Sequence, residues 1–400
     1  MKKVLFLAVL LSLTLSSEAY VPHRAVFPDI LGYQTLKGDF HNHTVFSDDT
    51  TWPSVRIDEA DFDGLDVISI TDHMDSRHMK QVHNGTFNKE TVDRNTSYKI
   101  AEAAAKQYGI IVIHGGELTR GLCLYPGHFN CHFITDGNVI ADKAEAAAAK
   151  CKGLEKQENA AIFTGLNEAR KQNAFIVWNH PDWERQAPNE TKWFPIHTEL
   201  LNQGLMNGIE IVNSFTGFDS EAFHWAVEKN LAIVSGTDCH QPMFRIVDYT
   251  KGEYRPMTLI LASERSANGV REALDAGRTM VFAYGHLYGK AEYLEPMFRA
   301  MVQISDITYS DKKVSFKLKN NSPMPLVLTK APGSEKVVYP RLIYVNEGEE
   351  LTVDIKGLVN TEPIGLDEFD VNFFVDNFES DVDTPLKVTY HFSMPENLRK

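Results

Sequence analysis

Two histidines separated by a single residue are the first sign of chemistry in the sequence. Residues 39–48, DFHNHTVFSD, are predicted to contain the end of a β-strand. Side chains alternate between the two faces of a strand, so His41 and His43 point the same way and can chelate one metal ion. Asn42 points the other way. The chain has 15 histidines, so one such pair also arises by chance and is weak support by itself.

Five further motifs place possible metal ligands at the ends of predicted strands or just beyond them. A single histidine or glutamate in such a place is more often an ordinary structural residue, so each motif alone is a modest indication. Their common location is informative, because parallel β/α barrels form active sites at the carboxyl ends of their strands. The motifs are Thr71-Asp72-His73, Gly115-Gly116-Glu117, Gly127-His128 followed by His132, Asn179-His180-Pro181, and Thr237-Asp238-Cys239-His240.

Two of these motifs contain a choice between neighbouring residues. His128 and His132 are both candidate ligands, and packing explains either one equally well. In the last motif Asp238 and His240 are expected to share one strand face. Cys239, on the opposite face, is therefore predicted to be a structural residue and not a catalytic one.

The scaffold of these motifs is predicted to be a parallel β/α architecture, because residues 35–290 alternate short β-like runs with helical stretches. The alanine-rich segment Ala141–Lys150 indicates an exposed helix within an insertion. The other predicted helices are Arg94–Tyr108, Leu154–Gln172, Ser220–Asn230 and Ser263–Ala276. The predicted strands are Asp39–Thr44, Val67–Thr71, Ile110–Glu117, Phe129–Thr135, Phe175–Asn179, Gly208–Val212, Ala232–Thr237 and Thr279–Tyr284.

The pattern changes after about residue 300, where short alternating or β-branched runs are separated by turn residues. This is typical of a small antiparallel β-sandwich. It contains one histidine, His391, and no cluster of ligand types, so we predict an accessory module over 299–400, after a catalytic domain over 20–298. The predicted strands are Val302–Ser310, Lys313–Lys319, Leu326–Thr329, Leu342–Val345, Glu350–Ile355, Val371–Val375 and Leu386–Phe392.

Residues 1–19 are predicted to be a cleaved signal peptide. Lys2 and Lys3 precede an apolar run over residues 4–15, and small residues at 17–19 resemble a cleavage site. The apolar run is shorter than the roughly 20 residues that span a bilayer. We therefore expect an exported protein, periplasmic or secreted, that is soluble after cleavage and has no membrane span.

The composition bears on partners and on the cysteines. Lysine and arginine total 40 against 54 for aspartate and glutamate, a net charge of −14, which disfavours long nucleic acids as partners. Cys123 and Cys131 are close enough in sequence for a disulfide, and Cys151 and Cys239 complete the four cysteines. The sequence does not choose among the possible pairings, and free buried thiols explain the four residues equally well.

The order of the six motifs resembles that of the polymerase and histidinol phosphatase (PHP) family. The similarity runs from about Asp39 to His240, which is nearly the whole first domain. It implies a distorted seven-stranded, TIM-like β/α barrel that hydrolyses phosphate esters with two or three divalent metal ions. The C-terminal module is similar, more loosely, to the Ig-like accessory β-sandwiches of secreted bacterial members.

The resemblance also implies a set of metal ligands. One ion would be held by His41, His43, Glu117 and Asp238, a second by Glu117, His128 and His180, and a third by Asp48, His73 and His240. His128 is preferred to His132 because its distance from Glu117 fits the family pattern better. Two features depart from that pattern. Asp49 stands where glycine is usual, and the insertion over 123–151 is unlike the compact members.

The expected chemistry is hydrolysis of a small phosphate ester by a metal-activated water. Imidazole-rich ligation with some carboxylate suits zinc, manganese or iron(II) better than calcium or magnesium. The predicted catalytic residues are Glu117, which would bridge two ions, and Arg120, which would hold a non-bridging phosphate oxygen. A surface arginine is an equally good interpretation of Arg120.

Other functions stay open at this level. A phosphate monoester is a dianion and usually requires several cationic groups, but only Arg120 and Arg245 lie near the motifs. A small phosphodiester is therefore slightly favoured over a monoester. The alternatives are a phosphomonoesterase, an exported metal- or phosphate-binding protein without activity, and a sandwich that binds an unknown protein or glycan partner.

Overall fold

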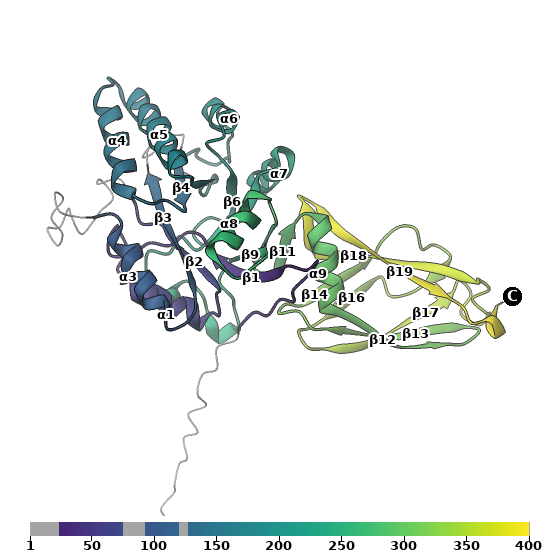
Figure 1. The fold of residues 1–400 in the computed structure, drawn as a ribbon. Coiled ribbons are helices and arrows are strands. Elements are labelled where there is room, and N and C mark those ends of the chain that lie inside the picture. The colour runs from purple at the N-terminus through teal and green to yellow at the C-terminus, as the bar shows by residue number, and fades with distance from the viewer. Residues whose placement is uncertain (1–23, 75–92, 120–126, 400) are drawn as a thin grey trace, which may run out of the picture.

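The computed structural model describes residues 24–74, 93–119 and 127–399 (Figure 1). The predicted signal peptide, Arg120 and Cys123 lie outside the described residues. Figure 1 shows a first part in which helices surround a twisted sheet, and a second, all-β part that extends away from it and carries the C-terminus at its far end. Within the described ranges, no helix combines the length and the apolar character needed to cross a membrane.

The strands of the first part form one curved sheet. In chain order they are β1 (Gln34–Asp39), β2 (Val67–Ile70), β3 (Ile111–Thr119), β4 (His128–His132), β5 (Phe175–Trp178), β6 (Gly208–Asn213), β7 (Gly217–Phe218), β8 (Ala232–Gly236), β9 (Met257–Ala262), β10 (Thr279–Ala283) and β11 (His286–Gly289). The order around the sheet is β9-β1-β2-β3-β4-β5-β6, with β8 paired to the other edge of β6. The β1–β2, β2–β3, β5–β6 and β6–β8 pairs are parallel, as expected.

The chain segments just beyond β1 and β8 are hydrogen-bonded to each other. The backbone N–H of Asp238 donates to the carbonyl of His41 (2.8 Å), and the N–H of His43 donates to the carbonyl of Cys239 (3.3 Å). This connection is consistent with the predicted barrel. It also brings the residues that follow both strands to the same end of the sheet.

Helices cover the outside of the sheet. They are α1 (Pro53–Phe62), α3 (Thr96–Ala105), α4 (Gly137–Ala149), α5 (Leu154–Lys171), α6 (Pro195–Asn202), α7 (Ser220–Lys229), α8 (Ala267–Asp275) and α9 (Ala291–Met301). The prediction that the alanine-rich segment is an exposed helix is wrong for one face of α4. Ile140, Ala141 and Ala144 are buried in the same cluster as Ala161 and Ile162 of α5, because small alanines let the two helices pack closely.

Strands β4 and β9 correct the expectation of an all-parallel sheet. β4 is antiparallel to both β3 and β5, because residues 120–127 are too few for the crossover of about a dozen residues that a parallel pair requires. The antiparallel direction brings the first residue of β4, His128, opposite Thr119 at the carboxyl end of β3. β9, which no predicted strand covers, is antiparallel to β1.

The predicted last strand of the barrel, Thr279–Tyr284, instead leads towards the second part. It forms β10, which is antiparallel to β9 and to β11. β11 pairs in parallel with β18 of the second part, with Leu287 opposite Phe378. Phe298 of α9 also packs edge-on against Phe378, with ring centroids 5.9 Å apart. The predicted boundary at 298/299 thus falls within a helix that contacts both parts.

The second part is the predicted β-sandwich. One sheet has the order β12-β13-β17-β15, and in the other β14 lies between β16 and β18, with β19 on the far side of β18. Burial alternates along β13, where Val314, Phe316 and Leu318 face the core. The strands are β12 (Val302–Tyr309), β13 (Lys313–Asn320), β14 (Leu326–Lys330), β15 (Val337–Val338), β16 (Leu342–Val345), β17 (Glu350–Gly357), β18 (Glu368–Asp381) and β19 (Thr384–Ser393).

The described cysteines are free thiols. Cys131 and Cys239 are buried, and Cys151 is partly exposed. Cys239 packs with Met243 and Val247, which agrees with its predicted structural role.

Candidate metal centre

His41 and His43 follow β1, and their rings face each other beside the same carboxylate. Their Nε2 atoms lie 3.2 Å apart, and Oδ1 of Asp238 lies 3.2 Å from His41 Nε2 and 3.1 Å from His43 Nε2. Asn42 is turned away, and its side-chain amide donates to backbone carbonyls of β1 and β2. The predicted alternation of side chains therefore holds at the end of β1.

Glu117 of β3 lies at the centre of the cluster, with its side chain fully buried. Oε1 lies 3.0 Å from Nδ1 of His128 and 3.8 Å from Nε2 of His180, and Oε2 lies 2.5 Å from Nδ1 of His73. The side-chain amide of Asn179 donates to Oε1 (3.0 Å). The two oxygens thus face different histidines, which is the arrangement that a carboxylate bridging two ions requires.

Asp48 and two histidines form a further group. Oδ1 of Asp48 lies 3.0 Å from Nε2 of His240 and 3.4 Å from Nε2 of His73. Nδ1 of His240 lies 2.7 Å from the backbone carbonyl of Asp238, and this contact leaves Nε2 facing Asp48.

Four groups of side chains bring possible ligand atoms within 4.8 Å of one another. Together they contain all nine residues that the sequence analysis assigned as metal ligands. The donors are imidazoles and carboxylates, a set that suits transition-metal ions. The groups are His43, Asp48, His73 and His240; His41, His180 and Asp238; His41, His43 and Glu117; and Glu117, His128 and His180.

The electrostatics of the cluster favour a bound cation. Burial lowers the pKa of His43 to about 3, and neighbouring histidines act in the same direction, so this imidazole stays neutral, the form that binds metals. Burial raises the pKa of Glu117 and Asp238, but the surrounding histidines outweigh it and hold both well below their usual range. Burial lowers the pKa of His41, yet the nearby carboxylates raise it to about 10. Carboxylates that attract a proton this strongly also attract a metal ion.

Glu210 of β6 is a buried carboxylate that the sequence analysis missed. Oε1 lies 3.2 Å from Nδ1 of His41, and Oε2 accepts from the backbone N–H of His180 (2.8 Å) and the side chain of Asn213 (3.1 Å). Engaging Nδ1 of His41 turns its Nε2 towards the cluster. One indication was present in the sequence, because Glu210 is the one charged residue in an otherwise apolar predicted strand, Gly208–Val212.

Asp49, which departs from the family pattern, forms a buried ion pair with Arg56 of α1. Arg56 also donates to the backbone carbonyls of His43 (3.0 Å), Cys239 (3.0 Å) and Gln241 (3.1 Å). One buried guanidinium therefore connects the segment after β1 with the segment after β8. These two segments carry ligands that follow β1 and β8, strands far apart in the sheet order given above.

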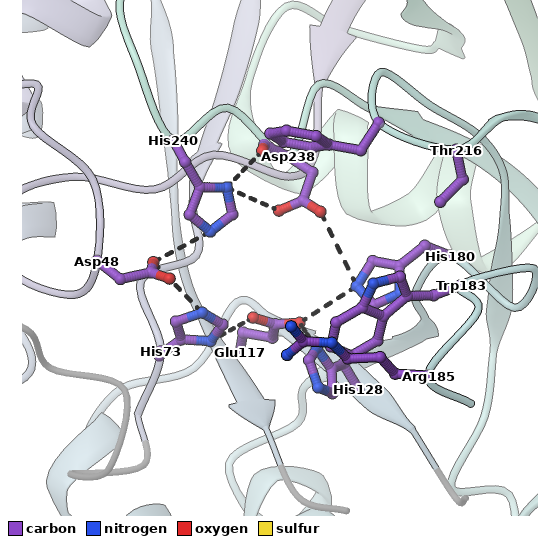
Figure 2. Close-up of a pocket in the computed structure, with 11 residues that line it drawn as sticks. Asp48, His73, Glu117, His128, His180, Trp183, Arg185, Thr216, Asp238 and His240 are labelled. Carbon is purple, nitrogen blue, oxygen red and sulfur yellow. Dashed lines mark hydrogen bonds and ion pairs between the residues drawn. The ribbon is translucent and has the colours of Figure 1, made fainter. Parts of the chain in front are cut away.

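The cluster opens into a cavity of about 420 Å³ (Figure 2). Besides predicted ligands, its lining contains Trp183 and Arg185, which follow β5, and Phe215 and Thr216, which follow β6. None of these four residues belongs to the motifs predicted from the sequence. Figure 2 shows Trp183 and Arg185 on the His180 side of the cavity, across from Asp48. The volume is suited to a small molecule.

The structure also places the remaining candidates. His132 is buried beside β2, with its Nδ1 2.8 Å from the hydroxyl of Ser69, and it belongs to none of the four groups. Arg245 is exposed and does not line the cavity. Arg120 lies outside the described residues.

Comparison with solved structures finds a similar protein over nearly the whole chain. It is a two-domain protein from Bacteroides vulgatus described as containing a predicted PHP-like metal-dependent phosphoesterase. The two are 37% identical, the alignment covers 92% of this chain and 98% of the other, and the TM-score is 0.81.

Other comparisons are partial. One is a protein from Bifidobacterium adolescentis described as a metal-dependent phosphoesterase, and another is an amidohydrolase from Chromobacterium violaceum. Each is 15% identical to this chain, and the alignments cover 51% of this chain and 87% and 88% of the other two. Their TM-scores are 0.36 and 0.33. A family model described as an Ig-like domain matches residues 302–391, within the predicted sandwich. No curated protein matches the chain.

Proposed function

The chain belongs to the PHP-like metal-dependent phosphoesterases, and we propose that it hydrolyses a small phosphate ester with a water molecule activated by divalent metal ions. The observation that carries the proposal is the convergence of nine histidine, aspartate and glutamate side chains in one cluster, seven of which line a single cavity. When bound, divalent ions lower the pKa of water and stabilise the charge that develops on the leaving oxygen.

The proposed ligand sets follow the sequence analysis, with zinc, manganese or iron(II) as the ions. Glu117 is the residue shared by two of them, and Asn179 orients one of its oxygens. Glu210 orients His41 in the same way. The three sets are His41, His43, Glu117 and Asp238; Glu117, His128 and His180; and Asp48, His73 and His240.

Charge explains how an acidic protein can take an anionic substrate. Asp48, Glu117 and Asp238 place three negative charges at the cavity. Two or three divalent ions would bring about +4 to +6, which leaves a net charge of about +1 to +3 facing the substrate. The cavity would then attract a phosphate despite the net charge of −14 of the whole chain.

Metal dependence is tested on the full mature chain. Metal-replete protein is expected to contain two or three transition-metal ions by elemental analysis. Chelation should abolish hydrolysis, and zinc, manganese or iron(II) should restore it. Fewer than one ion per chain would contradict the metal assignment. Full metal content without turnover of any phosphomonoester or phosphodiester would instead favour a binding protein.

For the ester class we propose a small phosphodiester in preference to a monoester. A monoester dianion demands more cationic donors, and Arg185 is the one lysine or arginine in the described lining of the cavity. The values of kcat/KM for bis(4-nitrophenyl) phosphate and 4-nitrophenyl phosphate under one metal condition distinguish the diester from the monoester. A clear preference for the monoester would reverse the class and leave the metal-dependent hydrolase unchanged.

We also propose that the protein is exported. The proposal rests on the predicted signal peptide over residues 1–19. Expression of the full-length chain followed by N-terminal sequencing of the purified protein should give a start at residue 20. A start at Met1 in protein recovered from the cytoplasm would contradict export.

A further inference from the structure

The segment after β5 is held tightly against the metal centre. The side-chain amide of Gln186 is buried and donates to the carbonyls of Asn179 (3.3 Å) and His180 (3.1 Å), and its oxygen accepts from the indole of Trp178 (3.2 Å). The backbone N–H of Trp183 also donates to the carbonyl of His180 (3.0 Å). These bonds give residues 179–186 a defined course beside the cluster.

This course brings the Trp183 side chain into contact with two of the proposed ligands. Its ring lies edge-on to the ring of His128, with centroids 4.8 Å apart, and to that of His180, at 5.3 Å. The central guanidinium carbon of Arg185 lies 5.4 Å from the centroid of the Trp183 ring, within the range of a cation–π contact. The indole therefore supports the guanidinium beside the metal centre.

Arg185 is set apart from other arginines by its surroundings. It is exposed and lines the cavity, and it forms no ion pair with a carboxylate among the described residues. In Figure 2 its side chain extends from the Trp183 side into the cavity. By contrast, Arg56 is fully buried and bonded to Asp49 and to backbone carbonyls. Arg185 thus keeps its donors available to a ligand.

We propose that Arg185 binds the phosphoryl group of the substrate, and that Trp183 positions the guanidinium for this contact. The planar fork of an arginine donates two parallel hydrogen bonds to two non-bridging phosphate oxygens. The inference deepens the proposed function and rests on it. It also assigns the role that the sequence analysis gave to Arg120 to a residue that follows the next parallel strand, β5.

The expected effect follows from the strength of such bonds. Removing a charge-assisted pair of hydrogen bonds weakens phosphate binding about 10- to 150-fold. Arg185→Lys keeps the charge and loses the fork, so its loss should be smaller than that of Arg185→Ala. Trp183→Leu removes the support and should weaken binding about 2- to 5-fold, whereas Trp183→Phe keeps an aromatic face and should restore most of the affinity.

The experiment measures calorimetric binding of inorganic phosphate to the metal-loaded full chain, and steady-state kinetics on the preferred ester. Arg245→Ala is the matched control, because Arg245 is also exposed and does not line the cavity. Arg185→Ala is expected to weaken phosphate binding and to raise KM by a larger factor than it lowers kcat. Arg245→Ala is expected to change neither quantity, and all variants should keep wild-type metal content.

The outcomes separate this inference from the proposed function. Wild-type turnover with unchanged phosphate binding in Arg185→Ala would overturn the role of Arg185 and leave the hydrolase standing. Phosphate binding that depends on Arg185 in a protein without turnover would support the role and overturn the hydrolase. Failure of inorganic phosphate to bind the metal-loaded wild-type protein would overturn the inference directly.

Discussion

The α/β first part and the sandwich bury different kinds of polar group. The first part buries carboxylates, imidazoles and two guanidiniums, those of Arg56 and Arg255. In residues 302–399, by contrast, the buried polar side chains are amides and hydroxyls, namely those of Asn320, Ser322, Ser334, Asn372 and Asn377. Both parts have extensive apolar cores, so the difference lies in the type of polar group that each part buries.

The energetic consequences differ as well. Burying a charge costs several kcal/mol unless it is paired and hydrogen-bonded, so such groups need partners, as Arg56 has in Asp49. A buried amide is satisfied more easily. Asn320 donates to the carbonyls of Met324 (2.8 Å), Val345 (3.1 Å) and Asn346 (3.1 Å) and thereby ties strand β13 to neighbouring turns. The comparison shows that buried ionisable groups gather where the proposed metal ligands lie, whereas the buried amides of the sandwich satisfy backbone groups.

The largest expected effect comes from removing proposed ligands. Asp238→Ala and His180→Ala should each lower kcat/KM at least about 1000-fold, because each side chain contacts the cluster from the end of a strand. The far-ultraviolet circular dichroism should remain like that of the wild type. His391→Ala, in an exposed histidine of the sandwich, is the control and should keep full activity. Near-normal turnover in either ligand variant would remove that residue from the proposed set.

The second effect concerns the buried arginine between the two ligand-bearing segments. Arg56→Met leaves Asp49 buried without its partner and should lower the free energy of unfolding by about 3–5 kcal/mol. Urea unfolding with metal analysis measures both the stability and the ion content, which should also fall. Arg24→Met removes an exposed pair with Asp61 and should cost less than about 1 kcal/mol. Equal losses in the two variants would contradict the structural role given to Arg56.

A smaller effect is expected in the sandwich. Asn320→Ala leaves buried carbonyls without donors and should lower the free energy of unfolding by about 1–3 kcal/mol. The values of kcat and KM should stay at wild-type levels below the unfolding transition, because the residue is in the part without proposed ligands. A drop in kcat with unchanged stability would show that the two parts are functionally coupled.

The smallest effect is a pH dependence of stability that arises in the first part of the molecule. Asp219 accepts from the N–H of Ala222 at the start of α7 (3.1 Å), and burial, with Asp182 nearby, raises its pKa to about 7. The folded state therefore favours the protonated acid, so the stability from this group is full below about pH 4 and is lost as pH rises through 7. Asp219→Asn keeps a good cap and removes the titration.

Thermal unfolding at pH 6 and pH 8 tests this sign. As the pH rises between the two values, the free energy of unfolding of the wild type should fall by about 1 kcal/mol relative to that of Asp219→Asn. A difference that is constant across pH would mean that Asp219 is ionised throughout. Among the described residues, the sandwich buries no carboxylate or imidazole that would add a similar dependence.

Local patterns in the sequence determined much of this protein. Alternation along a strand placed His41 and His43 on one face, and the structure has them with their Nε2 atoms 3.2 Å apart. Alternation and turn residues also predicted every strand of the sandwich except β15, a two-residue strand. Such features depend on a residue and its near neighbours, so the sequence pattern contains them in full.

Other features were decided only by the tertiary structure. His128 and His132 have the same parity on β4, but the register puts His128 opposite Thr119, near Glu117, and His132 opposite Gly115, deeper in the sheet. The direction of β4 likewise depends on the length of a connection. Both are properties of strand pairing, which the local pattern does not specify.

The polar groups that contact the ligand cluster were also decided only by the tertiary structure. Glu210 contacts His41 across 169 residues of sequence, and Arg56 contacts Cys239 across 183. Arg185 has its position because a short segment after β5 folds against the cluster. No spacing or periodicity encodes such meetings, because they arise when strand ends that are distant in the chain close into one curved sheet. The residue types that can bind metal were therefore visible in the sequence, whereas the groups that orient them and face the substrate depended on the closed fold.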